Sequence, residues 1–149
     1  MKKSIILLLV AAMGLSGMTA SAETGEMPDR TVNGVDYYIA STYSIEPRFT
    51  VLTECSNGLT DMGNGKLKCV GGTIVRNGYT AVTIMELQQL VNGEWSTIMT
   101  WSGQGGSNAS LEEYRYVDSG AYQVKVSHNA MSGSSSVETF TSYSKTVII

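Results

Sequence analysis

The sequence predicts an all-β protein, a single sandwich of two antiparallel sheets with about seven to eight strands. Short runs rich in Val, Ile, Thr and Tyr follow one another from residue 48 onward, separated by Gly, Asn and Ser. Asn64-Gly65 lies between two of these runs and suits the two positive φ angles of a type I′ hairpin turn, and residues 76–79 contain another Asn-Gly turn. Apolar and polar side chains alternate strictly over 121–127, which indicates a strand with one dry and one wet face. No window predicts a long amphipathic helix.

The positions of the Gly, Asn and Ser residues between these runs predict where the strands begin and end. Strands are expected at 48–55, 66–75, 80–91, 95–101, 111–117, 121–131 and 138–149, with turns at 56–65, 76–79 and 92–94 and longer loops at 102–108 and 132–136. The run 80–91 carries apolar groups on both faces around Glu86, which indicates a central strand or a bulge.

The alternation of side chains along each strand also predicts which of them lie in the core. In the fourth strand it places Trp95, Met99 and Trp101 on one face. In the sixth strand it places Val124 and Val126 on the same face as Tyr122. Because each buried aromatic ring removes about 150–250 Å² from water, we expect the tryptophans to dominate this core.

The first 22 residues form a predicted signal peptide. Lys2 and Lys3 precede an apolar run at 5–12, and Ala20-Ser21-Ala22 is a pattern that a signal peptidase accepts. The apolar run is too short to span a hydrocarbon layer of about 30 Å as a helix, so an uncleaved anchor is the weaker alternative. We therefore expect a secreted protein with a signal peptide at 1–22, a flexible or extended leader at 23–47 and a sandwich domain at 48–149.

The charge of the mature chain excludes two classes of partner. After cleavage eight Lys and Arg remain beside 13 acidic residues, a net charge of −5. Nucleic acid and anionic membrane surfaces both bind clustered positive charge, which this chain lacks. We expect neither nucleic-acid binding nor membrane association after signal cleavage.

Two cysteines, Cys55 and Cys69, are present. In an oxidising compartment a disulfide is the expected state, and it would stabilise the fold by roughly 3 kcal/mol. A structural metal site needs more Cys or His ligands than this chain offers, so we expect no metal and no cofactor.

The stretch 117–126 contains a D-x-G-x-Y motif, formed by Asp118, Gly120 and Tyr122. It resembles the tyrosine corner of the immunoglobulin fold, in which the tyrosine hydroxyl bonds a nearby backbone group at the start of strand F. The resemblance implies an immunoglobulin-like sandwich in which these three residues are structural. The family carries a cysteine two residues after the tyrosine, and here Val124 takes that place, so the usual disulfide between the sheets is absent.

The region 48–147 also resembles small secreted proteins of Gram-positive bacteria that have an immunoglobulin-like sandwich and no assigned function. The shared features are the cysteine pair, a tryptophan run ending in Trp101-Ser102-Gly103, and the strand from Gly120 to Val126. This resemblance implies export and a fold, and it implies no activity.

No catalytic group of residues can be recognised. His128 is the only histidine, and we expect it to be a partly exposed strand residue without a catalytic partner. Glu112 and Glu113 are adjacent, so on a strand they face opposite sides and cannot act as a catalytic pair. We expect no enzymatic activity.

The sequence therefore favours a non-catalytic binding or adhesion module for a glycan, a host protein or a cell-wall ligand. The candidate surfaces are the loops 102–108 and 132–136 with the nearby Tyr114, Tyr116 and Tyr143, because loops on a rigid scaffold often carry binding residues. Two alternatives remain open. One is a structural protein that self-associates through its last strand, 138–149, and the other is a secreted toxin or bacteriocin-like factor.

Overall fold

A computed structural model describes residues 27–39 and 49–149, and this part of the chain contains ten strands and no helix. The expected signal peptide lies outside the described residues. The strands are β1 (Arg30–Val32), β2 (Val35–Ile39), β3 (Leu52–Asp61), β4 (Lys66–Val75), β5 (Thr80–Val91), β6 (Glu94–Gly105), β7 (Asn108–Tyr116), β8 (Ala121–Ser132), β9 (Ser135–Tyr143) and β10 (Val147–Ile148). Every ladder is antiparallel, so the predicted all-β class is confirmed.

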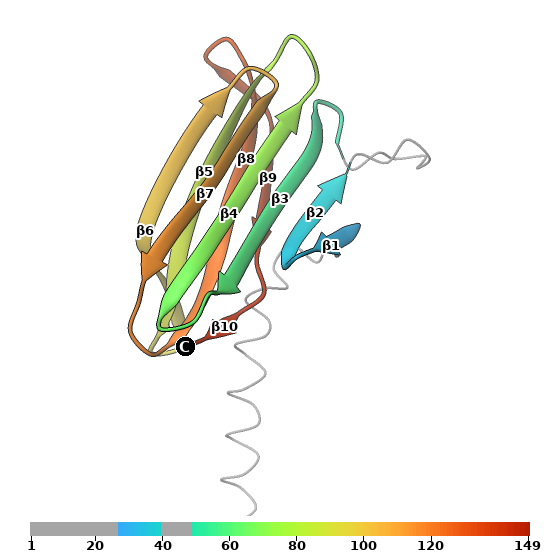
Figure 1. Cartoon of the computed structure of the whole chain (residues 1–149). Helices are drawn as coiled ribbons and strands as arrows, with labels where there is room; N and C mark the ends of the chain where they lie inside the picture. Colours follow the sequence, from blue (N-terminus) through green and yellow to red (C-terminus); the bar gives the residue numbers. More distant parts are fainter. Residues whose placement is uncertain (1–26, 40–48) are drawn as a thin grey trace, which may run out of the picture.

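The strands form two layers (Figure 1). Sheet A has the order β1-β2-β3-β4-β7. Sheet B has the order β10-β8-β5-β6, and β9 also pairs with β8. The chain passes from sheet B to sheet A between β6 and β7, at one side of the sandwich. Residues 30–39, which belong to the segment expected as a leader, add β1 and β2 to sheet A through the pairing of β2 with β3.

Several strands are longer than the sequence predicts, and the turns between them are correspondingly shorter. The expected turn at 56–65 shrinks because β3 continues to Asp61 and pairs with β4. Gly58 lies inside this strand, where an added Cβ would come 2.9 Å from the Gly34 carbonyl oxygen. Glycine at this position allows β2 to approach the backbone of β3 closely, and it does not form a turn. The hairpin turn itself falls at Gly63, Asn64 and Gly65, which have φ angles of 86°, 55° and 73°.

A β-bulge in β6 overturns part of the predicted core. Leu87 pairs with Met99 and Gln88 with Thr97, so Ile98 is an extra residue in the ladder. The bulge reverses the alternation, and Trp95 pairs with Leu90 on the outer face of sheet B. Met99 and Trp101 stay on the inner face, half-buried against the core. The prediction that Trp95 shares their face is wrong, because an extra residue shifts every side chain beyond it to the opposite face.

The interior contains two clusters of buried side chains. The aliphatic half consists of Leu59, Leu67, Cys69, Met85, Leu87, Tyr122, Val124 and Val126. The aromatic half consists of Tyr38, Phe49, Leu52, Cys55, Val75, Ala81, Ala109 and Ala130, with Phe140 packed against it. In the aromatic half the Phe140 ring centroid lies 5.1 Å from those of both Tyr38 and Phe49, in tilted and edge-on arrangements.

The expected disulfide between Cys55 and Cys69 is not formed. Cys55 pairs with Thr73 and Cys69 with Leu59, so the two cysteines are offset by four residues along neighbouring strands. This offset separates them by about 13 Å. A disulfide requires Cα atoms within about 7 Å, so the bond cannot form without rebuilding the sheet. Both side chains are buried, and burial raises the pKa of the Cys69 thiol to about 12.

Glu138 of β9 connects this strand to the start of β3. Its carboxylate accepts hydrogen bonds from the backbone amides of residues 50–52 at 2.6–2.9 Å. Desolvation alone would raise the pKa of this carboxyl, but the three amides and the Thr50 hydroxyl hold it below its usual range. Glu138 thereby joins the edge of sheet B to the start of β3 in sheet A.

Candidate binding groove

The outer face of sheet A is hollowed along its middle. One hollow of about 220 Å³ is lined by Tyr37, Glu54, Ser56, Val70, Gly71, Gly72, Ile74 and Ser110. A second, of about 410 Å³, is lined by Val32, Asn33, Val35, Tyr37, Thr60, Met62, Lys68, Val70 and Glu112. Because Tyr37 and Val70 line both hollows, the two adjoin, and we call them together the sheet A groove.

Two glycines of β4, Gly71 and Gly72, line the first hollow. Gly72 pairs with Ser56 of β3. A Cβ at Gly72 would lie 2.7 Å from the Ser56 hydroxyl and 3.6 Å from the Ser110 hydroxyl. The absence of a side chain at position 72 therefore leaves both hydroxyls room at the surface of the groove.

One end of the groove is organised by Arg30, Tyr37 and Glu54, from β1, β2 and β3. The Arg30 guanidinium carbon lies 4.6 Å from the centroid of the Tyr37 ring. The same guanidinium contacts the Glu54 carboxylate at 3.3 Å. Arg30 thus holds an aromatic ring and a carboxylate side by side at the surface.

The other end contains Lys66, Lys68, Glu112, Tyr114 and Tyr116, from β4 and β7. The Tyr114 hydroxyl donates to Glu112 at 2.8 Å, and the Lys68 ammonium contacts the same carboxylate at 3.0 Å. These two contacts lower the pKa of Glu112, and the contact with Glu112 raises the pKa of Lys68 and of Tyr114. The Lys66 ammonium lies 4.8 Å from the Tyr114 ring centroid and 5.8 Å from that of Tyr116.

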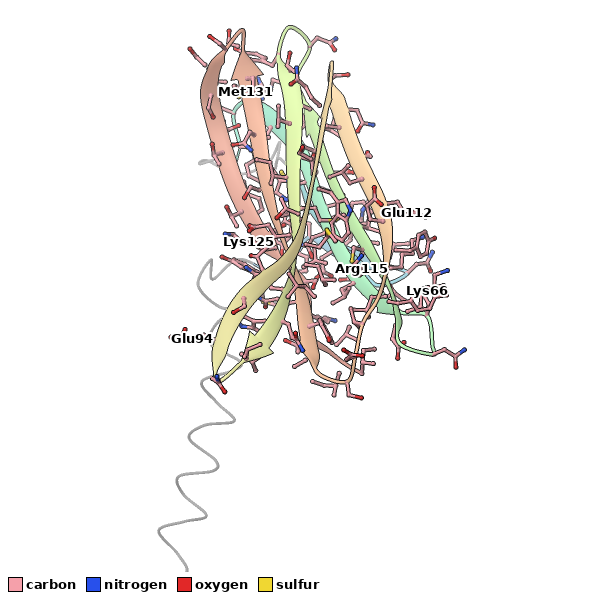
Figure 2. All side chains as sticks on the ribbon, turned by 90° about the vertical axis from the view of Figure 1, so that its left-hand side faces the viewer. Lys66, Glu94, Glu112, Arg115, Lys125 and Met131 are labelled. Carbon is pink, nitrogen blue, oxygen red and sulfur yellow. The ribbon has the colours of Figure 1, made fainter. Side chains whose placement is uncertain are left out.

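Figure 2 shows how the two outer faces are separated. Lys66 and Glu112 project to one side of the sandwich, and Lys125 projects to the other. Lys125 belongs to a polar row on sheet B, where it contacts Glu86 at 3.2 Å. On that face Gln123 donates to Gln88 at 2.8 Å. Polar groups pair with one another on both faces, and those of sheet A also border the two hollows.

The candidate loops of the sequence prediction contribute little to this surface. Loop 102–108 is reduced to residues 106 and 107, because β6 extends to Gly105 and β7 begins at Asn108. Loop 132–136 is reduced to residues 133 and 134. Of the three tyrosines assigned to these loops, Tyr114 and Tyr116 lie beside the groove with 46% and 70% of their surface exposed. Tyr143 lies on β9 in the other sheet.

The D-x-G-x-Y motif forms a structural corner at the start of β8. The Tyr122 hydroxyl donates to the Asp118 carbonyl oxygen at 2.7 Å, and the ring is buried. Burial raises the pKa of this phenol. A Cβ at Gly120 would approach the Gln89 amide nitrogen to 2.9 Å and the Tyr122 ring edge to 3.3 Å. A side chain at position 120 would therefore press against the Tyr122 ring and require the Gln89 amide to move.

His128 is fully buried, so the prediction of a partly exposed histidine is wrong. Its Nδ1 lies 2.9 Å from the Thr73 hydroxyl and its Nε2 lies 2.8 Å from the Ser142 hydroxyl. Thr83 joins the network through its hydroxyl, 2.7 Å from that of Thr73. Desolvation lowers the pKa of His128 to about 3, so the ring is neutral near pH 7. His128 lies an even number of positions from Tyr122 and Val124 on β8. Its side chain is therefore on the same inward face of the strand as theirs.

The two adjacent glutamates lie on opposite faces of β7, as strand alternation predicts. Glu112 borders the groove, and Glu113 pairs with Cys69 on the inner side of sheet A. Within residues 27–39 and 49–149, no group of three or more His, Cys, Asp or Glu side chains is placed to hold a metal ion. The same residues contain no helix long and apolar enough to cross a membrane.

Comparisons with protein-family models, with curated proteins and with solved structures found no match. Any functional assignment must therefore rest on the geometry of the molecule itself.

The sequence alone did not indicate Tyr37, Glu54 or the two glycines of the groove as site residues. The available signal was the presence of Gly71 and Gly72 inside a β-forming run, since an interior glycine marks a place where another group approaches the backbone.

Proposed function

We propose that this protein is a secreted, non-catalytic binding module that holds a glycan in the sheet A groove. The observation that carries the proposal is the mixed lining of the groove. Tyr37 and Val70 supply apolar surface to both hollows, while carboxylate, hydroxyl and amide groups surround them. Such a combination of apolar walls with a few convergent polar groups is typical of a small-molecule site.

A sugar ring matches this lining because it has two kinds of surface. Its C–H faces are apolar and pack against aromatic side chains such as Tyr37. Its hydroxyls both donate and accept hydrogen bonds, so they can pair with the Glu54 carboxylate and with the hydroxyls of Ser56 and Ser110. Two adjoining hollows favour a chain of sugars over a single one.

The immunoglobulin-like character of the sandwich is part of the same proposal. In that fold, strands A, B and E belong to one sheet and strands C, F and G to the other. Here β3, β4 and β7 would correspond to A, B and E, and β5, β8 and β9 to C, F and G. The Tyr122 corner then falls at the start of strand F, which supports the correspondence. β6 would be the additional strand C′.

A location outside the cell would bring the groove into contact with extracellular glycans. The predicted signal peptide at 1–22 and the resemblance to small exported proteins of Gram-positive bacteria support a location outside the cell. There the accessible polymers include wall and host glycans. A binding module without catalytic groups would attach the protein to one of them.

The test is a glycan array probed with the purified secreted protein, followed by calorimetry with the strongest ligand. Tyr37→Ala should weaken binding at least tenfold, about 1.4 kcal/mol, because it removes the wall that both hollows share. Glu54→Gln should weaken binding while leaving the groove's shape intact. Tyr143→Ala, a tyrosine on the other sheet, is the matched control and should bind as the unaltered protein does.

Two outcomes would contradict the proposal. One is the absence of any glycan ligand at millimolar concentration. The other is a ligand whose affinity is unchanged by both groove substitutions, since that ligand would be bound elsewhere on the molecule.

A further inference from the structure

The outer edge of β6 stands apart from the other sheet edges of the molecule. β6 spans twelve residues, and in the described part of the chain it pairs only with β5. Its second edge therefore carries a row of backbone N–H and C=O groups that no other described strand pairs with. Figure 2 looks onto this side of the sandwich, where β6, at the edge of sheet B, rises from Glu94.

Edge strands in soluble proteins usually carry features that prevent them from pairing with another chain, such as charges, prolines or a cover. Three of the other edge strands here have them. β7 carries Glu112, Glu113 and Arg115. β9 is bound through Glu138 to the backbone of residues 50–52. β1 is three residues long and begins with Arg30.

β6 lacks a comparable charge or proline along almost its whole length. After Glu94, the residues from Trp95 to Gly105 include no charged side chain and no proline. They are rich in β-branched and aromatic residues, and Ile98 at the bulge is 41% exposed. The β propensity of such a segment favours strand pairing, and no charge within residues 95–105 opposes it.

We propose that two copies of this chain associate through their β6 edges, in antiparallel pairing about a two-fold axis. In such a pairing the same segment supplies both strands, and residues at equal distances from the two-fold axis face each other, so like charges near the axis would lie close together. The absence of charge from 95 to 105 makes the edge complementary to itself. The two sheets B would then form one continuous sheet across the dimer.

This inference is independent of glycan binding, since the sheet A groove and the β6 edge share no residue. The test is sedimentation velocity of the secreted protein over a concentration series from about 1 to 500 µM, which would detect dissociation constants from micromolar to submillimolar, about −8 to −5 kcal/mol. We expect a dimer that dissociates on dilution. Hydrogen exchange should show that alternate backbone amides of β6 become protected as the dimer forms.

Ile98→Lys places a charge on the edge and should weaken dimerisation at least tenfold. Val137→Lys is the matched control: it places the same charge on β9, at a position of similar exposure, 48%. It should dimerise as the unaltered protein does. Circular dichroism of both variants establishes that each is folded.

Three results would overturn the proposal. The first is a monomer across the whole concentration series. The second is a dimer that Ile98→Lys leaves intact. The third is a dimer that Val137→Lys disrupts, which would place the interface on β9.

Discussion

The two halves of the core are built from different chemistry. The aliphatic half is held by branched and thioether side chains, with Tyr122 as its one hydroxyl-bearing member. The aromatic half surrounds Phe140, which stacks on His128 with ring centroids 5.8 Å apart. There the buried hydroxyls of Thr73, Thr83 and Ser142 form one network with the imidazole. In the aromatic half, the buried hydroxyls and the imidazole therefore satisfy one another's hydrogen bonds.

The largest expected effect comes from the aliphatic half. Leu67 is fully buried there, and Leu67→Ala should lower the free energy of unfolding by about 2–5 kcal/mol through lost burial and a residual cavity. Chemical denaturation measures this change. A loss below about 1 kcal/mol would mean that the neighbouring side chains collapse into the space, and that this half is less tightly packed than the structure indicates.

Acid should act mainly through the aromatic half. The pKa of His128 is lowered from 6.5 to about 3, so the folded state resists the proton that the unfolded state accepts. Stability is therefore complete above pH 6.5 and falls as the pH decreases toward 3, by about 1.4 kcal/mol per pH unit and about 2 kcal/mol at pH 5.

Denaturation curves between pH 7.5 and pH 5 measure this slope. Glu138 acts in the same direction but at lower pH, because its pKa is held below the ordinary carboxyl value of 4.5. The control is His128→Leu, which should be less stable overall and lose most of the pH dependence in this window. An equal slope in the variant would assign the effect to another group.

A smaller effect is expected at the tyrosine corner. Tyr122→Phe keeps the buried ring and removes the hydrogen bond to the Asp118 carbonyl, so it should cost about 0.5–1.5 kcal/mol. The comparison variant is Tyr116→Phe, an exposed tyrosine, which should change stability little. If both substitutions have the same effect, the corner does not stabilise the fold.

The smallest effect concerns the cysteines, one in each half of the core. Because Cys55 and Cys69 are offset by four residues in neighbouring strands, reduction has no disulfide to break. The midpoint temperature of thermal unfolding should be the same whether the protein is heated with or without a reductant. A drop of several degrees on reduction would show that the cysteines pair and that the register of β3 and β4 differs from the one described.

The sequence by itself determined the features that depend on neighbours along the chain. Alternation and Asn-Gly turns specified antiparallel strands, because a strand's two faces and a hairpin's turn are local properties. The corner was equally local, since the Tyr122 hydroxyl bonds a carbonyl four residues away.

Only the tertiary structure decided the features that depend on what lies opposite a residue. The bulge at Ile98 moved Trp95 to the outer face, and the register of β3 with β4 separated the cysteines. The sheet A groove arose in the same way, because Tyr37 and Gly72 lie on strands that meet only through β3. Register is set by long-range pairing, and a shift of one residue exchanges the two faces of a strand. A local sequence pattern cannot carry that information.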